Sequence, residues 1–321
     1  MNANANVGRE EVRIGGNTYF VPSAKICGQP VIITGRFLRV AAIKDEELVD
    51  GETVAEPGVF LNEIRRSFPQ ADVFSFVQKI PDVIARHSYM TEWDNAAVIP
   101  ITSLDDWLKN RVSTDVRKSV KKAARLGVVV MPVEFDDELV RGIMGIYNDS
   151  PIRQGKAFWH YKKEFEKVKS ENATYLERSQ FIGAYFQNEL IGFIKMVYVD
   201  RIATTIQVIS KKSQYDKKST NALLAKAIEI CSEKRLSHLV YGSYAYNDTN
   251  SSLTEFKRRN GFEKVMFPRY FVPLTSKGLL AVKLGLHRGL WGNVPEPARA
   301  FLRRARSGFC NAVFSREKAS A

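Results

Sequence analysis

The segment SPIRQGKAFWHY, residues 150–161, combines side chains that can hold a ligand with one that can move a proton. Aromatic rings offer faces for stacking, and Arg153 can pair with a phosphate or a carboxylate. Histidine is the side chain that most often serves as a general base near neutral pH, so His160 is a candidate general base. Such a mixture suits a sugar or a peptide as ligand, and an ordinary loop anchored by its aromatic residues is the alternative. The candidate ligand contacts are Arg153, Gln154, Trp159 and Tyr161, which the family resemblance described below places on the acceptor side.

A second candidate is Lys257, within the segment NSSLTEFKRRNGFEK, residues 250–264. The segment predicts a short helix, because Ser251 or Ser252 can cap its start and Gly261 suits the left-handed position after its end. The lysine is the first of three successive cations. It is therefore either a solvated surface charge or a cation directed at a site.

Tyrosines supply the remaining candidates. The segment YGSYAYND, residues 241–248, follows a short apolar strand, so its side chains lie where that strand ends. We assign Tyr246 as a candidate acid and Tyr244 as a contact to the acceptor. Simple packing within a loop is the alternative.

The elements that must position these residues follow from apolar periodicity. From residue 128 the pattern predicts a strand, two helices, three strands, a helix, a strand, a helix and a last strand. The turn at Gln187-Asn188 joins the first two of the three strands as a hairpin. Residues 103–127 predict one continuous amphipathic helix, capped by Ser103, whose basic face is either solvated or anion-binding. The order is that of an α/β (α+β) protein.

This order resembles the GNAT acyltransferase fold over about residues 128–273. QNELIGFIKM is similar to that family's second and third strands, and NSSLTEFKRRNGF resembles its closing helix. IATTIQVIS stands where a splayed strand takes the pantetheine arm of acyl-CoA, and YDKKSTNALLAKAIE stands where a pyrophosphate loop enters a helix. The resemblance implies a mixed, mostly antiparallel sheet flanked by helices.

Two departures from the family pattern favour one branch of it. Asp216, Ser219 and Asn221 replace the family's Arg or Gln and two glycines, and Lys257 stands where many members carry a tyrosine. A Phe-Lys pair and the basic segment STDVRKSVKKAARLGVVV resemble the FemABX branch, which transfers aminoacyl groups from aminoacyl-tRNA to peptidoglycan precursors. The chain is also similar to acetyltransferases associated with exopolysaccharide synthesis. The two GNAT-like halves of FemABX proteins imply a smaller, degenerate GNAT-like half at residues 12–127.

The resemblance also implies roles for individual residues. Lys257 would stabilise a tetrahedral oxyanion or the leaving oxygen, and a backbone N–H near Val208 or Ile209 would donate to the oxyanion. The donor stays open between acyl-CoA (acetyl-CoA) and aminoacyl-tRNA, and no metal is expected. The implied donor-binding residues are Val208, Ile209, Lys217, Lys218, Ser219, Thr220, Asn221 and Asn250.

Charge and cysteine content indicate the partners and the compartment of the protein. The net charge of +13 favours a polyanionic partner, with solubility alone as the alternative. Nine Lys or Arg against two Glu stand in residues 276–321. This basic amphipathic helical tail, 275–321, suits an anionic membrane surface or RNA, or packs back onto the protein. The three cysteines have no metal or disulfide spacing, which favours a cytoplasmic location, with the inner face of the membrane as a peripheral site.

The sequence thus predicts four segments: a disordered start at 1–11, an N-terminal α/β half at 12–127, a GNAT-like domain at 128–274 and the tail. We expect an N-acyltransferase that acts on an amine of a cell-envelope or polysaccharide precursor. The alternative is a non-catalytic membrane- or RNA-binding adaptor on a decayed GNAT fold.

Overall fold

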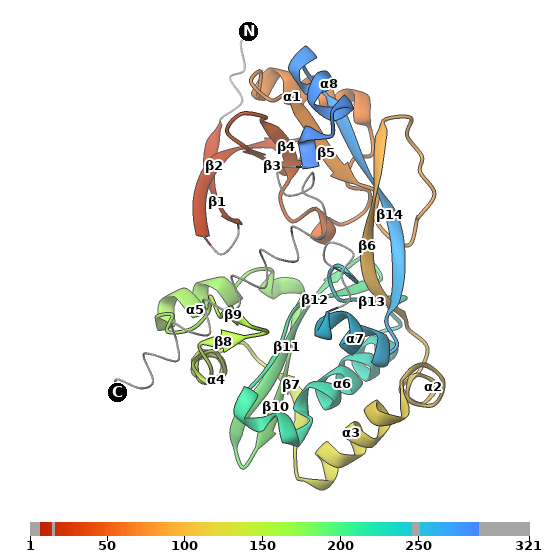
Figure 1. Cartoon of the computed structure of the whole chain (residues 1–321). Coiled ribbons are helices and arrows are strands. Elements are labelled where there is room, and N and C mark those ends of the chain that lie inside the picture. Colours follow the sequence, from red (N-terminus) through yellow and green to blue (C-terminus); the bar gives the residue numbers. More distant parts are fainter. Residues whose placement is uncertain (1–6, 15–16, 246–250, 289–321) are drawn as a thin grey trace. The chain divides into compact units, whose positions relative to one another are not determined.

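The computed structural model describes residues 7–14, 17–245 and 251–288 (Figure 1). Residues 8–11, predicted to be disordered, form the start of strand β1. In the described ranges, no helix combines the length and apolar character that crossing a membrane requires. The part of the predicted tail beyond residue 288 lies outside the described residues.

Contacts between residues divide the chain into two compact units. Unit 1 comprises Met1–Asp94 and Met266–Arg303, and unit 2 comprises Asn95–Val265 and Arg304–Ala321. The predicted boundary after residue 127 therefore falls within unit 2, between a helix and a strand.

Unit 1 is built on a mixed sheet in which β4 and β5 are parallel and the other described pairs are antiparallel. Helix α1 (Pro57–Ser67) connects the parallel pair and buries Phe60, Leu61 and Ile64 on one face. Helix α8 (Ser276–Lys283) and the turn η6 (Leu286–Arg288) follow the last strand, and η1 (Glu46–Leu48) follows β4. The strands are, in sheet order, β1 (Gly8–Ile14), β2 (Asn17–Ile26), β3 (Gln29–Thr34), β4 (Val40–Ile43), β5 (Val73–Val77) and β14 (Glu263–Pro273).

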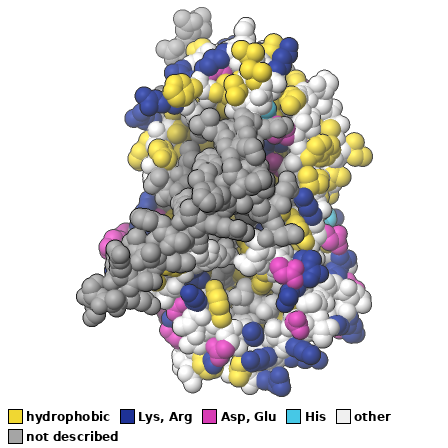
Figure 2. Space-filling view, viewed as in Figure 1, with side chains coloured by type: hydrophobic (Ala, Val, Ile, Leu, Met, Phe, Trp, Pro, Cys, Tyr) yellow, Lys and Arg dark blue, Asp and Glu magenta, His cyan; other side chains and the backbone are white. Residues whose placement is uncertain are grey.

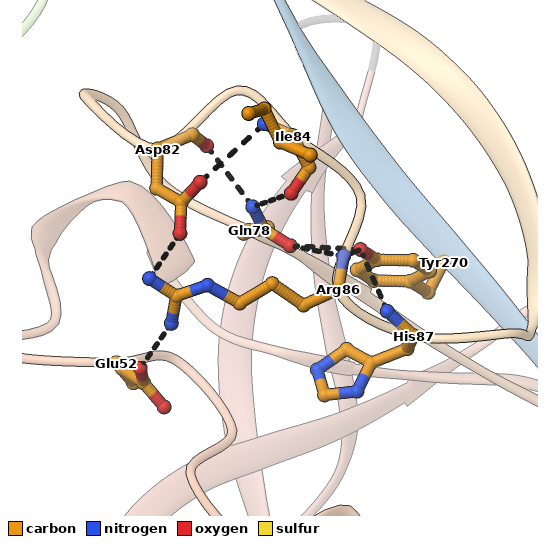
Figure 3. Close-up of polar contacts among 7 residues, drawn as sticks. All are labelled: Glu52, Gln78, Asp82, Ile84, Arg86, His87 and Tyr270. Atoms are coloured by element: carbon orange, nitrogen blue, oxygen red, sulfur yellow. Dashed lines mark hydrogen bonds and ion pairs between the residues drawn. The ribbon is translucent and has the colours of Figure 1, made fainter.

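One buried tyrosine of β14 fixes the loop after β5. The Tyr270 hydroxyl donates to the Gln78 side chain at 2.8 Å and accepts from the Arg86 backbone N–H at 2.8 Å. Arg86 extends from this point to Glu52 and Asp82, as Figure 3 shows. A buried phenol needs such partners, so Tyr270 determines the path of the loop.

The strands of unit 2 also pair in a mixed arrangement, in which only β12 and β13 are parallel among the described pairs. The hairpin between β10 and β11 is confirmed, with Gln187 and Asn188 both at positive φ. The mixed, mostly antiparallel sheet with flanking helices is also as predicted. The strands are, in sheet order, β6 (Met90–Pro100), β13 (His238–Val240), β12 (Ile202–Ser210), β11 (Glu189–Val199), β10 (Ser179–Phe186) and β7 (Val129–Val133).

Helices cover both faces of this sheet (Figure 1). Helices α3 and α6 share one apolar core with residues such as Ile194 and Met196 of β11, whereas α4 packs against Leu190 and Phe193. The helices of unit 2 are α2 (Leu104–Asp106), α3 (Thr114–Arg125), α4 (Asp137–Asn148), α5 (Phe165–Asn172), α6 (Ser219–Glu233) and α7 (Ser252–Arg259). Shorter elements are η2 (Trp107–Arg111), η3 (Leu176–Arg178), η4 (Lys212–Lys217), and the hairpin of β8 (Ile152–Arg153) and β9 (Lys156–Ala157).

The single helix predicted at residues 103–127 is wrong. Ser103 caps the start as predicted, but α2 passes into the π-helical turn η2 and the chain becomes extended at Val112. Ser113 then caps a second helix by accepting from the Val116 N–H at 3.4 Å. A second cap residue interrupts the apolar stripe without changing its spacing, and the periodicity therefore hides the break.

Candidate functional site

Strands β12 and β13 pair over only three residues and then separate. The last paired residues are Thr204 and Val240, and the Thr205 hydroxyl makes one further bond to the Val240 carbonyl at 3.0 Å. Just beyond this point β12 contains a bulge. Lys195 and Met196 of β11 pair with Gln207 and Thr205 of β12, so Ile206 between them has no partner residue in β11. A bulge bends the strand that carries it. The bulge at Ile206 is thus the local cause of the separation that the resemblance predicts.

Beyond the separation, alternate backbone N–H groups of β12 point away from β11, on the side from which β13 has departed. The Lys211 N–H donates to Ile191 of β11 at 2.7 Å, and bonding alternates along an antiparallel ladder. The N–H of Ile209 therefore points to β11, and that of Val208 points to the opposite side. The Ser210 carbonyl, which shares the direction of Val208, accepts from Arg153 rather than from β11. Of the two predicted oxyanion donors, Val208 has the suitable direction.

Lys257 is buried at the end of β13 and not spread on the surface. Its side chain is 1% exposed, its Nζ donates to the Ser243 carbonyl at 2.6 Å, and it lies 4.5 Å from the centroid of the Tyr241 ring. Burial lowers the pKa of Lys257 to about 8. Helix α7 holds it there, with Ser251 as the N-cap and Gly261 at φ +78° after the end, both as predicted.

The neighbouring cations of α7 have a different role. Arg258 and Arg259 are exposed, and both bond to Glu255 on the same helix, at 2.8 Å and 2.6 Å. Of the run Lys257-Arg258-Arg259, only the lysine enters the interior of unit 2. A buried lysine whose pKa is lowered is a candidate functional group, and Lys257 is such a residue.

Lys195 is a second buried lysine, and its surroundings explain it fully. Its Nζ donates to the carbonyls of Asn172 and Thr174 at 2.8 Å and 2.6 Å, and to the Thr174 hydroxyl at 3.0 Å. Burial lowers its pKa to about 8 as well. Lys195 ties the end of α5 to β11, so it has a structural role.

Asn260 joins the elements around Lys257. This buried residue donates from its amide to the Phe256 carbonyl at 2.7 Å and accepts from the Asn221 amide at 3.0 Å. Its backbone carbonyl accepts from the Trp107 indole at 3.0 Å. Asn260 thus connects the start of α6 to the end of α7.

Protein groups already bond to the segment that matches the pyrophosphate loop and to the residues just before it. The Asp149 carboxylate accepts from the Lys212 and Ser213 N–H groups at 2.6 Å and 3.2 Å. Ser219 is buried where the family has a glycine, and its hydroxyl has no hydrogen-bond partner among the described residues. Asn221, at the other glycine position, bonds to Asn260.

The other predicted donor residues lie around the same turn. Thr220 shares a hydrogen bond of 2.9 Å with Ser210, and Lys217 pairs with Asp216 at 2.8 Å. Lys218 is left-handed at φ 61°, directly before α6, which begins without a side-chain cap. The structure therefore brings Val208 and residues 217–221 to one end of β12 and α6.

The acceptor candidates lie around α4 and its connection to α5. His160 is buried, and its ring lies 4.1 Å from Tyr147 and 3.6 Å from Trp159, measured between centroids. Its Nδ1 is 3.7 Å from the Glu171 carboxylate, which also pairs with Lys163. His160 therefore belongs to an aromatic stack, and its role as a base stays a prediction.

The remaining acceptor candidates differ in their freedom to meet a ligand. The Arg153 guanidinium donates hydrogen bonds to the carbonyls of Ser210 and Ile146, at 2.8 Å and 2.9 Å. Gln154 forms the turn between β8 and β9 with φ 51°, and Trp159 is 46% exposed. Tyr161 and Tyr244 are half-buried. Tyr246 and Asn250 lie outside the described residues.

Sequence reasoning missed two further polar residues of this region. The Gln207 side chain accepts from the buried Tyr147 hydroxyl at 2.9 Å, beside the separation of β12 and β13. A glutamine within the apolar strand IATTIQVIS is the signal that could have indicated it. Asn260 gave no separate signal, because an Asn-Gly pair after a helix is already accounted for as the end of that helix.

Comparisons with known proteins establish the fold of the chain. No protein-family model and no curated protein matches it. It is similar in structure to FemX, with a TM-score of 0.58 and 8% identity over 87% of this chain and 90% of that one. It is also similar to the C-terminal domain of a lysylphosphatidylglycerol synthetase from Agrobacterium fabrum, with a TM-score of 0.53 and 14% identity over 83% and 88%.

A third structure of this kind is L-PGS from Bacillus licheniformis, with a TM-score of 0.53 and 13% identity over 85% of this chain and 90% of that one. Each match spans both units of the chain rather than a single GNAT-like half. The chain therefore has a FemX-like fold, shared with these two synthetase structures.

Proposed function

We propose that this protein is an N-acyltransferase that moves an acyl or aminoacyl group from an activated ester to an amine of a cell-envelope or polysaccharide precursor. One observation carries the proposal. Lys257 is a buried cation at the end of β13, next to the point where β12 leaves that strand.

Acyl transfer to an amine requires that the protein position the two substrates and stabilise the negative charge that develops. The neutral amine attacks the ester carbon, the C–N bond forms, and the C–O bond to the donor breaks. Negative charge develops first on the carbonyl oxygen and then on the leaving oxygen. The Val208 N–H would donate to the first, and the Lys257 ammonium would stabilise the second. The proton that the amine loses would pass to the leaving oxygen or to water.

For the donor, the region around α6 favours aminoacyl-tRNA over acyl-CoA. Two glycines would let backbone N–H groups close on a pyrophosphate, but Ser219 and Asn221 fill both positions. Asp149 occupies the amides at the start of η4. The names of the structural neighbours, among them a lysylphosphatidylglycerol synthetase, also suit an aminoacyl group and an envelope acceptor.

A donor-binding experiment tests this proposal. A ligand that binds only the folded state raises the unfolding midpoint when its concentration is well above Kd. We expect salt-sensitive binding of aminoacyl-tRNA in a filter assay and no midpoint shift with acetyl-CoA. A clear rise of the unfolding midpoint with acetyl-CoA would mean that acyl-CoA, and not aminoacyl-tRNA, is the donor. Failure of both donors to bind would favour the non-catalytic adaptor instead.

A further inference from the structure

Helix α8 in unit 1 presents its largest apolar side chains to solvent. Its buried face consists of Gly278, Ala281 and Val282, which pack near Val73 and Phe271. An amphipathic helix ordinarily buries its large apolar residues and exposes its small or polar ones. Here four leucines of α8 and the turn after it are between 45% and 60% exposed: Leu279, Leu280, Leu284 and Leu286.

Contacts to one aspartate fix this orientation. A Cβ atom on Gly278 would lie 1.8 Å from the Asp72 carbonyl oxygen, so no larger residue can take its place against unit 1. The Asp72 carboxylate accepts from the Thr275 hydroxyl and from Lys277, each at 3.0 Å. Thr275 in turn caps the helix by accepting from the Gly278 N–H at 3.0 Å. Helix α8 cannot rotate its leucines inward without breaking these contacts.

An exposed phenylalanine extends the apolar surface beyond the helix. Lys277 donates to the Phe37 carbonyl, which brings the turn before β4 to the start of α8. Phe37 is 83% exposed, while the next residue, Leu38, packs against the core under the helix. We call Phe37, Leu279, Leu280, Leu284 and Leu286 the α8 patch. Figure 2 shows hydrophobic side chains gathered at the end of unit 1 that carries α8, with Lys and Arg among them.

Positive charge accompanies the α8 patch. Arg36 and Lys283 are exposed beside Phe37 and Leu284, and neither has an ion-pair partner within the described part of the chain. The sequence that follows η6 continues this bias with Arg299, Arg303, Arg304, Arg306, Arg316 and Lys318 against two glutamates. Exposed apolar surface flanked by cations fits the boundary between lipid headgroups and acyl chains.

We propose that the α8 patch docks this protein on the surface of an anionic lipid bilayer. The leucines and Phe37 enter the headgroup boundary, and Arg36 and Lys283 meet the lipid phosphates. This inference stands independently of the proposed acyl transfer, because it rests on unit 1 residues that have no part in that chemistry. It would bring the protein to acceptors that are carried by lipids.

Vesicle flotation of the full chain tests the proposal. Vesicles of phosphatidylglycerol and phosphatidylcholine are compared with vesicles of phosphatidylcholine alone, at low and at high salt. We expect binding to the anionic vesicles that weakens as salt screens the charges. The double variant Leu280→Asp/Leu284→Asp should bind about a hundredfold less, since burying each leucine contributes about tenfold.

Matched variants separate docking from general effects. Ile84→Asp changes an apolar residue of unit 1 that lies outside the α8 patch and is more exposed than Leu280 and Leu284. This variant should bind vesicles as the wild type does. All variants should keep the unfolding midpoint of the wild type, because the replaced side chains are exposed. Equal vesicle binding by the double variant would overturn the proposal, as would an absence of wild-type binding. A dimer that the double variant abolishes would also overturn it, because the patch would then join two copies of the chain.

Discussion

Replacing Lys257 with methionine tests whether its burial serves catalysis. Methionine keeps most of the volume of the side chain and removes the charge together with the bond to Ser243. We expect kcat to fall by about 10²–10³, the usual cost of removing one group that stabilises a developing oxyanion. Binding of the donor should change little, because the cation would act mainly on charge that develops during the reaction.

The same substitution has a predictable effect on stability. Burial lowers the pKa of Lys257 from 10.5 to about 8, so the unfolded chain holds this proton more tightly than the folded chain. Below pH 8 the lysine is charged in both states and costs about 3 kcal/mol, at about 1.36 kcal/mol for each pKa unit. As pH rises from 8 to 10.5 the folded lysine is neutral, and this cost disappears.

Denaturant unfolding at several pH values measures this contribution. The free energy of unfolding of the wild type should rise relative to that of Lys257→Met by about 3 kcal/mol between pH 8 and 10.5. The difference between the two proteins isolates Lys257 from the other groups that titrate in this range. The bond lost to Ser243 shifts the variant by an amount that does not depend on pH, provided that the fold is kept.

Lys195→Met is the matched control. Lys195 is equally buried, and its pKa is also lowered to about 8, so it should give the same pH signature. Its Nζ holds structural carbonyls, and its loss should destabilise unit 2 and leave the kcat of the folded fraction near the wild-type value. Equal losses of kcat in the two variants would refute the reasoning, because burial alone would then explain both lysines.

Three further predictions follow from individual contacts. In the wild type, kcat should fall as pH rises through about 8, because Lys257 loses its charge there. Lys257→Arg should shift that fall to higher pH, and the pH profile of kcat at saturating amine measures this. Asn260→Ala should lower the free energy of unfolding by about 1–3 kcal/mol, because it removes the side-chain bond to the Phe256 carbonyl and the acceptor of the Asn221 amide, and urea unfolding measures this. Gly278→Ala should destabilise unit 1 by about 1–3 kcal/mol, since its Cβ would overlap the Asp72 carbonyl, and an unchanged thermal midpoint would show that α8 is not held as described.

Local signals predicted much of the fold. The cap residues Ser103 and Ser251, the stop at Gly261 and the turn at Gln187-Asn188 all act within a few residues of the chain, and the structure has each of them. The order of strands and helices in unit 2 follows from such signals. The break at Ser113 was missed because two competing caps stand in one uninterrupted apolar stripe.

The state of each candidate site residue was less predictable, because distant partners determine it. Nothing in the run Lys257-Arg258-Arg259 indicates which cation is buried. The decision comes from the Ser243 carbonyl and the Tyr241 ring, on a different loop. In the same way, the ring of Tyr147 from α4 makes His160 part of a buried stack, and two carbonyls from separate elements take the guanidinium of Arg153.

The orientation of α8 was also beyond the sequence pattern. A strip of leucines ordinarily predicts a buried face, and the sequence alone offered membrane docking, RNA binding or packing onto the protein as alternatives for the whole tail. The glycine on the opposite side of the helix determines the outcome, because only Gly278 fits against the Asp72 carbonyl.

A single-turnover transfer experiment tests the central claim most directly. Aminoacyl-tRNA with a labelled aminoacyl group is incubated with excess protein and a simple primary amine, and the label is followed from the ester to the amide. The account predicts transfer by the wild type, and by Lys195→Met, at rates about 10²–10³ above that of Lys257→Met, with all three proteins binding the tRNA equally. Transfer by Lys257→Met at the wild-type rate would contradict the account, because the buried ammonium would then have no part in the reaction.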